Sequence, residues 1–218
     1  MNIAAIGPPE RLEELHSVIS SAGLEFTRLE STKNIGKAGY DVIFDLDFDD
    51  RPWSISDYQD LPSQAFVFLS SVKIQLEAVV PKSMWNKVAG INALPSFLKR
   101  KSLEYCMAEG EPDAGMIARL GWAESNRCAS RVGLVSARVI LMIINEAFYT
   151  LQEGTANKED IDKGMKLGTA YPHGPFEWCR IIGIKNVYET LKALYDDTLD
   201  ERYRICNLLK TEYIISQN

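Results

Sequence analysis

The chain has 218 residues, enough to bury a core and to form one or two domains. Its net charge of −6 lacks the basic surface that nucleic acids and acidic membranes attract, so we expect neither as a partner. The N-terminal "MNIAAIG" has no basic start, and no apolar run is long enough to span a membrane. The cysteines show neither a CxxC pair nor a metal-binding spacing: Cys106, Cys128, Cys179 and Cys206. We therefore expect a cytoplasmic protein with reduced thiols and no metal.

Short apolar or β-rich runs alternate with polar or helical segments through the first part of the chain. The runs cover residues 2–7, 24–30, 40–47, 64–71, 87–94 and 102–110. Residues 8–22 are typical of a helix that ends at Gly23, and "VKIQLEAVV" at 72–80 is typical of another. This alternation predicts a mainly parallel sheet covered by helices, that is, an α/β domain.

From about Gly133 the pattern becomes wholly helical. A long apolar helix is expected over 133–153, and a second helix over 157–168, with Asn157 as its cap. Further helices follow within 174–183, 186–197 and 199–215. The sequence therefore predicts an α/β domain over 1–125 and an all-α domain over 126–218.

The turn after the first run, "AAIGPPERLEEL" at 4–15, resembles the start of a dinucleotide-binding fold. The dinucleotide fingerprint places glycines at the first, third and sixth positions of this turn, which here are Gly7, Pro9 and Leu12. Proline removes a backbone N–H where phosphate should bind, and leucine places a bulky side chain where only hydrogen fits. Glu10 adds a negative charge at the helix N-terminus. The helix can still begin here, but dinucleotide binding is expected to be weak or absent.

One acidic residue could still serve a cofactor. Glu30 follows Gly7 by 23 residues, close to the spacing of the acid that binds the ribose of NAD. A surface charge at the end of a strand is the simpler explanation, which we favour. Gly7 and Glu30 are thus the remaining candidates for weak cofactor binding.

The helical part carries a family resemblance. "EDIDKGMKLGTAYPHGPFEWCRIIGI" at 159–184, preceded by "VGLVSARVILMIINEAFYTLQEG" at 132–154, resembles the C-terminal domain of the 3-hydroxyacyl-CoA dehydrogenase family, and in particular its 3-hydroxybutyryl-CoA dehydrogenases. "FLSSVKIQLEAVV" and "VAGINAL…SLEYC" resemble, less closely, the segments that hold the family's catalytic residues. The resemblance implies a Rossmann-like NAD-binding domain followed by a helical dimerisation domain.

Laid over the family pattern, the catalytic positions are only partly retained. In the family, a histidine paired with a glutamate takes a proton from the 3-hydroxyl while hydride leaves for NAD. The resemblance places Asn92 at the histidine, Glu104 at the glutamate and Ser70 at the serine, the last with one inserted residue before Asn92. Ala137 stands where the family has an asparagine. An amide cannot act as a general base, so proton transfer is expected to fail.

The two histidines of the chain do not replace the missing base. His16 is expected to be a solvated residue of the first helix, and His173 a turn residue in "YPHGPFEW". The long helical hairpin that the family places after its second strand is also reduced to about ten residues, "STKNIGKAGY". The pattern favours a shortened family member with altered cofactor and catalytic motifs.

Three functions remain open from the sequence. The first is a 3-hydroxyacyl-CoA dehydrogenase-like protein that has become a binding or assembly module, with acyl-CoA as a ligand. The second is a working NAD-dependent dehydrogenase that oxidises a 3-hydroxyl to a ketone. The third is a structural partner of a full-length relative. NAD is expected as a cofactor only in the second case.

The resemblance also implies a homodimer through the helical domain. The helix over 133–153 is apolar around most of its circumference, so it must be covered on several sides. Residues expected at the seam are Phe176, Trp178, Ile181 and Ile182. The alternative is that this helix packs against the α/β domain and that the protein is a monomer.

Overall fold

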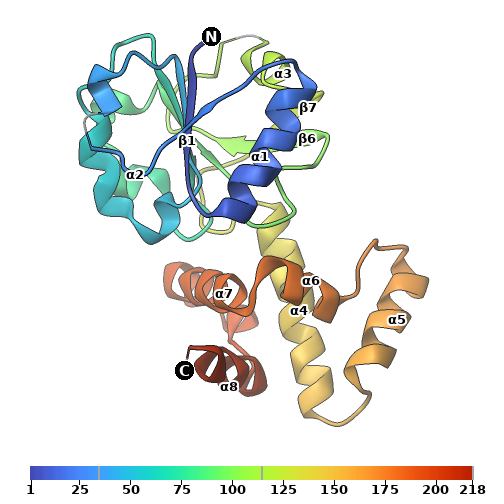
Figure 1. Ribbon diagram of the computed structural model, residues 1–218. Helices are drawn as coiled ribbons and strands as arrows, with labels where there is room; N and C mark the ends of the chain where they lie inside the picture. Colours follow the sequence, from blue (N-terminus) through green and yellow to red (C-terminus); the bar gives the residue numbers. More distant parts are fainter. Residues whose placement is uncertain (34, 114, 218) are drawn as a thin grey trace. The chain divides into compact units, whose positions relative to one another are not determined.

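The computed structural model describes residues 1–33, 35–113 and 115–217. The chain forms two compact units, Met1–Leu134 and Val135–Asn218 (Figure 1). The first is an α/β unit built on a mainly parallel sheet and the second is wholly helical, which confirms the predicted fold class. The expected boundary at 125/126 falls inside a strand of the sheet, so the first unit extends beyond it.

The sheet of the α/β unit has seven strands in the order β2-β1-β3-β4-β5-β6-β7. The strands are β1 Ile3–Ile6, β2 Thr27–Arg28, β3 Val42–Asp45, β4 Phe66–Ser70, β5 Val88–Ile91, β6 Ser102–Cys106 and β7 Glu124–Arg127. Each neighbouring pair is parallel except β5 with β6, which is antiparallel. From β1 the chain continues to β2 on one side, and then crosses to β3 on the other side of β1. The topological switch point therefore lies between β1 and β3.

Two elements differ from the sequence prediction for local reasons. The edge strand β7 reads "ESNR", and its residues are exposed, so it shows none of the apolar alternation that identifies a strand. The helix expected over 72–80 is only α2, Leu76–Val79. Val80 is extended because it precedes Pro81, and proline disfavours the helical conformation in the residue before it.

The helix α1, Pro9–Ser21, packs on one face of the sheet (Figure 1). Its apolar stripe joins alternate residues of the strands and the buried Trp122 in one hydrophobic core. This stripe is Leu12, Leu15, Val18 and Ile19. The opposite face carries Gly90 and Cys106, and Leu76 of α2 lies over Gly90. The short helix α3, Met116–Arg119, completes the unit.

The second unit consists of five helices among the described residues (Figure 1): α4 Ser136–Gln152, α5 Lys158–Thr169, α6 Pro175–Ile182, α7 Ile184–Thr198 and α8 Asn207–Ser216. Asn157 caps α5 as predicted, accepting the Asp160 N–H at 2.9 Å. The buried Asn145 of α4 donates to the Arg204 carbonyl and accepts from the Cys206 N–H, both at 2.9 Å, which fixes the segment before α8. No described helix is both long enough and apolar enough to cross a bilayer.

The absence of a side chain at Gly90 gives the first testable prediction. A Cβ at this position would lie 2.1 Å from the Ser71 Oγ and 2.8 Å from the Cys106 Sγ, so Gly90→Ala should destabilise the protein by about 1–3 kcal/mol. Gly164 in α5 is the matched control: nothing lies near its added Cβ, and Gly164→Ala should stabilise the helix by roughly 1 kcal/mol. Urea unfolding of both variants measures this, and equal effects would contradict the packing described.

Candidate active site

Three polar residues stand side by side where β4, β5 and β6 meet. The register pairs Ser70 with Ile91 between β4 and β5, and Ile91 with Tyr105 between β5 and β6. Continued by one residue, it sets Ser71, Asn92 and Glu104 in a row across the three strands. The Ser71 N–H donates to the Ile91 carbonyl at 3.1 Å, which supports this continuation. The register therefore brings together Asn92 and Glu104, both candidates from the sequence.

Asn92 is the centre of this row. Its side chain is buried, and its Oδ1 accepts the Leu94 N–H at 3.2 Å. Glu104 is half-buried, and its charge acts on two neighbours. Burial lowers the pKa of Arg100, and the Glu104 carboxylate partly offsets this lowering. Burial and the Glu104 charge together raise the pKa of Cys128. An asparagine can donate and accept hydrogen bonds at this position, but it cannot take up a proton.

The two serines at the end of β4 have different surroundings. Ser70 is fully buried and donates to the Asp49 carboxylate at 2.6 Å. Ser71 lies on the same face as Gly90 and Cys106, the face of Asn92 and Glu104. The resemblance places the family's serine at Ser70, with one inserted residue before Asn92. Ser71, which needs no inserted residue, is a second candidate for the same position.

Cys106 borders this row. Burial raises the pKa of its thiol to about 11, against the lowering effect of hydrogen bonds with Ser130 and Ser71. Burial disfavours the thiolate, which is the reactive form of a cysteine. The Cys106 Sγ lies over Gly90, so this side chain packs beside the row.

The remaining sequence candidates do not belong to this row of strand residues. Ala137 is fully buried in α4, in the helical unit. His16 is half-exposed in α1, 3.4 Å from Glu25, and His173 packs edge-on against Trp178. Glu30 is exposed just after β2. Within the described residues, no cluster of histidine, cysteine or carboxylate side chains could hold a metal ion.

The turn between β1 and α1 is the segment that would bind the phosphates of a dinucleotide. Pro8 and Pro9 carry no N–H, and the amides of Arg11 and Leu12 donate to the Pro8 carbonyl at 3.1 and 3.0 Å. The Leu12 side chain is buried in the core beneath α1. A helix N-terminus binds phosphate through its first four N–H groups, which have no partner within the helix. Here those of Pro8 and Pro9 are missing and that of Arg11 is already satisfied. The residues present do not fit the pyrophosphate of NAD.

Buried carboxylates at the ends of β3 and β4 were not predicted from the sequence. Asp45 accepts from Arg51 at 2.9 Å and from the Tyr58 hydroxyl at 2.8 Å. Asp49 accepts from Ser70 and from two backbone N–H groups, those of Val72 and Lys73. Burial raises the pKa of both carboxyls, against these hydrogen bonds and nearby cations. The acid-rich "DLDFDDR" at 45–51 is the only signal, and it is equally typical of a solvated loop.

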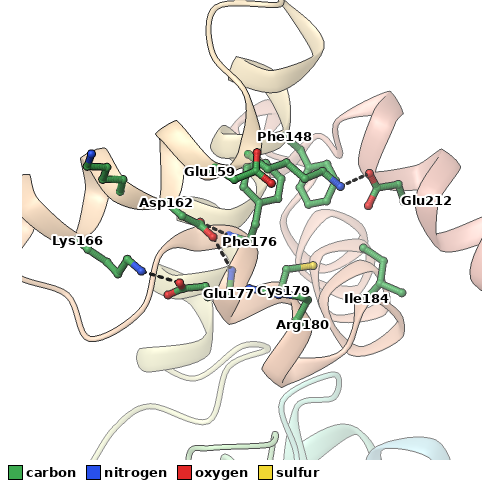
Figure 2. Close-up of a pocket in the computed structure, with 12 residues that line it drawn as sticks. Phe148, Glu159, Asp162, Lys166, Phe176, Glu177, Cys179, Arg180, Ile184 and Glu212 are labelled. Carbon is green, nitrogen blue, oxygen red and sulfur yellow. Dashed lines mark hydrogen bonds and ion pairs between the residues drawn. The ribbon is translucent and has the colours of Figure 1, made fainter.

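A separate cavity of about 770 Å³ lies within the helical unit (Figure 2). Phe148 and Phe176 form part of its apolar wall, with ring centroids 5.0 Å apart. Lys158 binds Glu212 at 2.7 Å, and Lys166 binds Glu177 at 2.6 Å. The Asp162 carboxylate accepts the N–H groups at the start of α6, as Figure 2 shows. Most of its charged groups therefore already have partners, and the catalytic candidates are not among its lining residues.

The Asp45–Arg51 pair gives a prediction that depends on pH. Arg51→Met leaves Asp45 buried without its cation and should cost about 2–4 kcal/mol at pH 7. Because burial holds the folded-state pKa of Asp45 above its unfolded value, this carboxyl favours the folded state at low pH and loses that contribution as pH rises through the folded pKa. The cost of Arg51→Met should therefore shrink as the pH is lowered towards 4.

The control is the double variant Asp45→Asn/Arg51→Met, which removes the fully buried carboxyl and keeps only the part-exposed Asp47, the second carboxylate that Arg51 binds, at 3.1 Å. Denaturant unfolding between pH 4 and 7 should show a cost that depends on pH more strongly for the single variant than for the double variant. Parallel curves for the two would contradict the role of Asp45.

Comparison with known proteins places these features in a family. Residues 133–214 match the model of the 3-hydroxyacyl-CoA dehydrogenase C-terminal domain. The chain is 31% identical over 148 residues to the 3-hydroxyadipyl-CoA dehydrogenase of Escherichia coli, a match that covers 66% of this chain and 29% of that protein. It is 44% identical over 72 residues to a 3-hydroxybutyryl-CoA dehydrogenase of Bradyrhizobium diazoefficiens, covering 33% of this chain and 25% of the relative. The matched segments thus span less than a third of these relatives.

The fold is similar to that of solved dehydrogenases over nearly the whole chain. The (S)-3-hydroxybutyryl-CoA dehydrogenase PaaH1 of Ralstonia eutropha superposes with a TM-score of 0.68 at 18% identity, covering 99% of this chain and 94% of that one. FadB2 of Mycobacterium tuberculosis gives a TM-score of 0.76 at 14% identity, with the same coverage. These two structures show the fold. The match over residues 133–214 and the 31% identity to the Escherichia coli protein show that the chain belongs to the 3-hydroxyacyl-CoA dehydrogenase family.

Proposed function

We propose that this family member binds acyl-CoA thioesters without oxidising them, as a binding or assembly module. The observation that carries the proposal is Asn92 opposite Glu104, where the resemblance implies a histidine–glutamate pair. The altered turn between β1 and α1 supports it independently, because hydride transfer also needs a bound dinucleotide.

The row retains groups that can hold an acyl oxygen. The Ser71 hydroxyl and the Asn92 amide are neutral donors and acceptors, so they can bind either a 3-hydroxyl or a 3-keto oxygen. Neither changes its charge near neutral pH. A ligand held in this way is positioned but not deprotonated, and its binding should vary little between pH 6 and 8.

The other two functions lead to different observations. An active dehydrogenase would bind NAD and turn over 3-hydroxybutyryl-CoA, with Ser71 and Glu104 retained from the family pattern. A structural partner would bind a full-length relative in a pull-down and would not bind acyl-CoA. We also propose the cytoplasm as its location, since all four cysteines are free thiols.

Asn92→Leu should weaken acyl-CoA binding. The apolar side chain keeps a similar volume and removes the hydrogen-bonding amide, so the affinity for 3-hydroxybutyryl-CoA should fall roughly tenfold, as expected for one hydrogen bond. Asn86→Leu, at an exposed asparagine in the turn before β5 and at the opposite end of that strand from Asn92, is the control and should bind like the parent protein. Calorimetry with 3-hydroxybutyryl-CoA, and with CoA alone, gives both affinities. Binding that is absent in the parent protein, or unchanged in Asn92→Leu, would contradict the proposal.

We further propose a homodimer formed through the helical unit. Several apolar residues of this unit are exposed: Leu167, Ile181, Ile214 and Ile215. Of the residues expected at the seam, Phe176, Trp178 and Ile182 are buried within the unit itself, and Ile181 is exposed. Apolar side chains that remain in water favour association with a second copy.

Ile181→Glu should shift the protein from dimer to monomer, because it places a charge in the proposed interface. Leu199→Glu, at an exposed apolar position after α7, is the control and should leave the mass unchanged. Ile144 is unsuitable for this test, since it is buried and a charge there would disrupt the fold. Light scattering at micromolar concentration measures the mass. A monomeric parent protein would contradict the dimer.

A further inference from the structure

The topological switch point between β1 and β3 is bridged by a side chain of the protein itself. Open α/β sheets bind their ligands in the crevice at the carboxyl ends of the strands on either side of such a point. Here Arg11, in the first turn of α1, donates from Nη1 to the Leu46 carbonyl at 2.5 Å. Arg11 belongs to the helix that follows β1, and Leu46 directly follows β3, so this hydrogen bond crosses the switch point.

The two segments that it joins are also in direct backbone contact. The Leu46 N–H donates to the Ile6 carbonyl at 2.8 Å. A Cβ at Gly7 would lie 2.8 Å from the Leu46 Cβ. The close approach of Leu46 therefore requires a glycine at position 7, whether or not a phosphate binds there. Arg11 is only 4% exposed, so its side chain is buried between α1 and the segment that follows β3.

A second contact ties α1 to the loop after β5. Glu14, one turn further along α1, accepts the Ser96 N–H at 2.7 Å. Burial raises the pKa of Glu14, against the hydrogen bond from Ser96 and the charges of Lys99 and Arg11. Arg11 and Glu14 lie three residues apart on one face of the helix, so they act as neighbours. The first two turns of α1 are thus linked to the chain after β3 and the chain after β5.

We propose that Arg11 is an internal bridge that occupies the dinucleotide crevice and closes it. This inference goes beyond the missing glycines, because it states what takes the cofactor's place. It predicts that restoring the glycine pattern alone does not restore binding. It is also independent of acyl-CoA binding, which concerns the row at the ends of β4 to β6.

The binding test compares two sets of substitutions. The double variant Pro9→Gly/Leu12→Gly rebuilds the glycine pattern and keeps the bridge, and the triple variant adds Arg11→Met, which retains an unbranched side chain without the guanidinium. Calorimetry with NADH should detect no binding to the parent protein or the double variant, and measurable binding to the triple variant. Low-micromolar binding to the parent protein, or equal binding to the double and triple variants, would overturn the proposal. So would a folded triple variant that does not bind.

A second measurement needs no variant and keeps the inference testable if the triple variant fails to fold. Phenylglyoxal modifies accessible guanidinium groups, and peptide mapping by mass spectrometry reports each arginine. In the native protein Arg11 should react at least roughly tenfold more slowly than the exposed Arg28 of β2. In urea both should react alike. Equal rates in the native protein would show that Arg11 is free to leave the crevice, and the bridge would be refuted.

Discussion

The antiparallel pairing of β5 with β6 is the constraint on which the candidate site depends. All other strand pairs of the sheet are parallel. Because β6 runs antiparallel to β5, Glu104 lies opposite Asn92 in the register of the two strands. The parallel pairing of β4 with β5 then adds Ser71 to the same row. No loop conformation is needed to bring the three residues together, because backbone register alone sets their spacing.

Buried charged side chains also gather at this end of the sheet. Asp45 and Asp49 are buried, and each is held by several donors, whereas a functioning dinucleotide site leaves donors free for phosphate. Arg11 follows the same pattern, with its guanidinium on a backbone carbonyl. The Asp45 and Asp49 carboxylates and the Arg11 Nη1 are therefore bound to other groups of the protein.

The sequence predicted the fold class because its signals were repetitive. Apolar runs recur along the first half, and the helical pattern begins where the second unit does. The edge strand β7 was missed since its four residues are polar and exposed, and its pairing with β6 is a tertiary effect. The predicted boundary at 125/126 cuts through this strand for the same reason.

The site was predictable only in part. Asn92 and Glu104 could be identified from aligned motifs, but their position opposite one another depends on register, which a motif does not contain. The difference between Ser70 and Ser71 is a matter of which face each occupies, and one inserted residue reverses it. Arg11 does not stand at a glycine position of the dinucleotide fingerprint, so the motif does not single it out. Its contact with Leu46 joins residues 35 positions apart, and nothing in the local sequence indicates it.

The central claim is that the row Ser71–Asn92–Glu104 holds an acyl thioester without moving its proton. A single-turnover experiment tests it most directly, with the protein in excess over NADH and acetoacetyl-CoA and with NADH absorbance followed over time. A positioned general base is worth roughly a hundred- to ten-thousand-fold in rate, and Asn92 cannot supply it. We expect the absorbance to decay no faster than in the absence of protein, and we expect Asn92→His alone not to change this. Oxidation of NADH at about 1 per second or faster, near ordinary enzyme turnover, would contradict it.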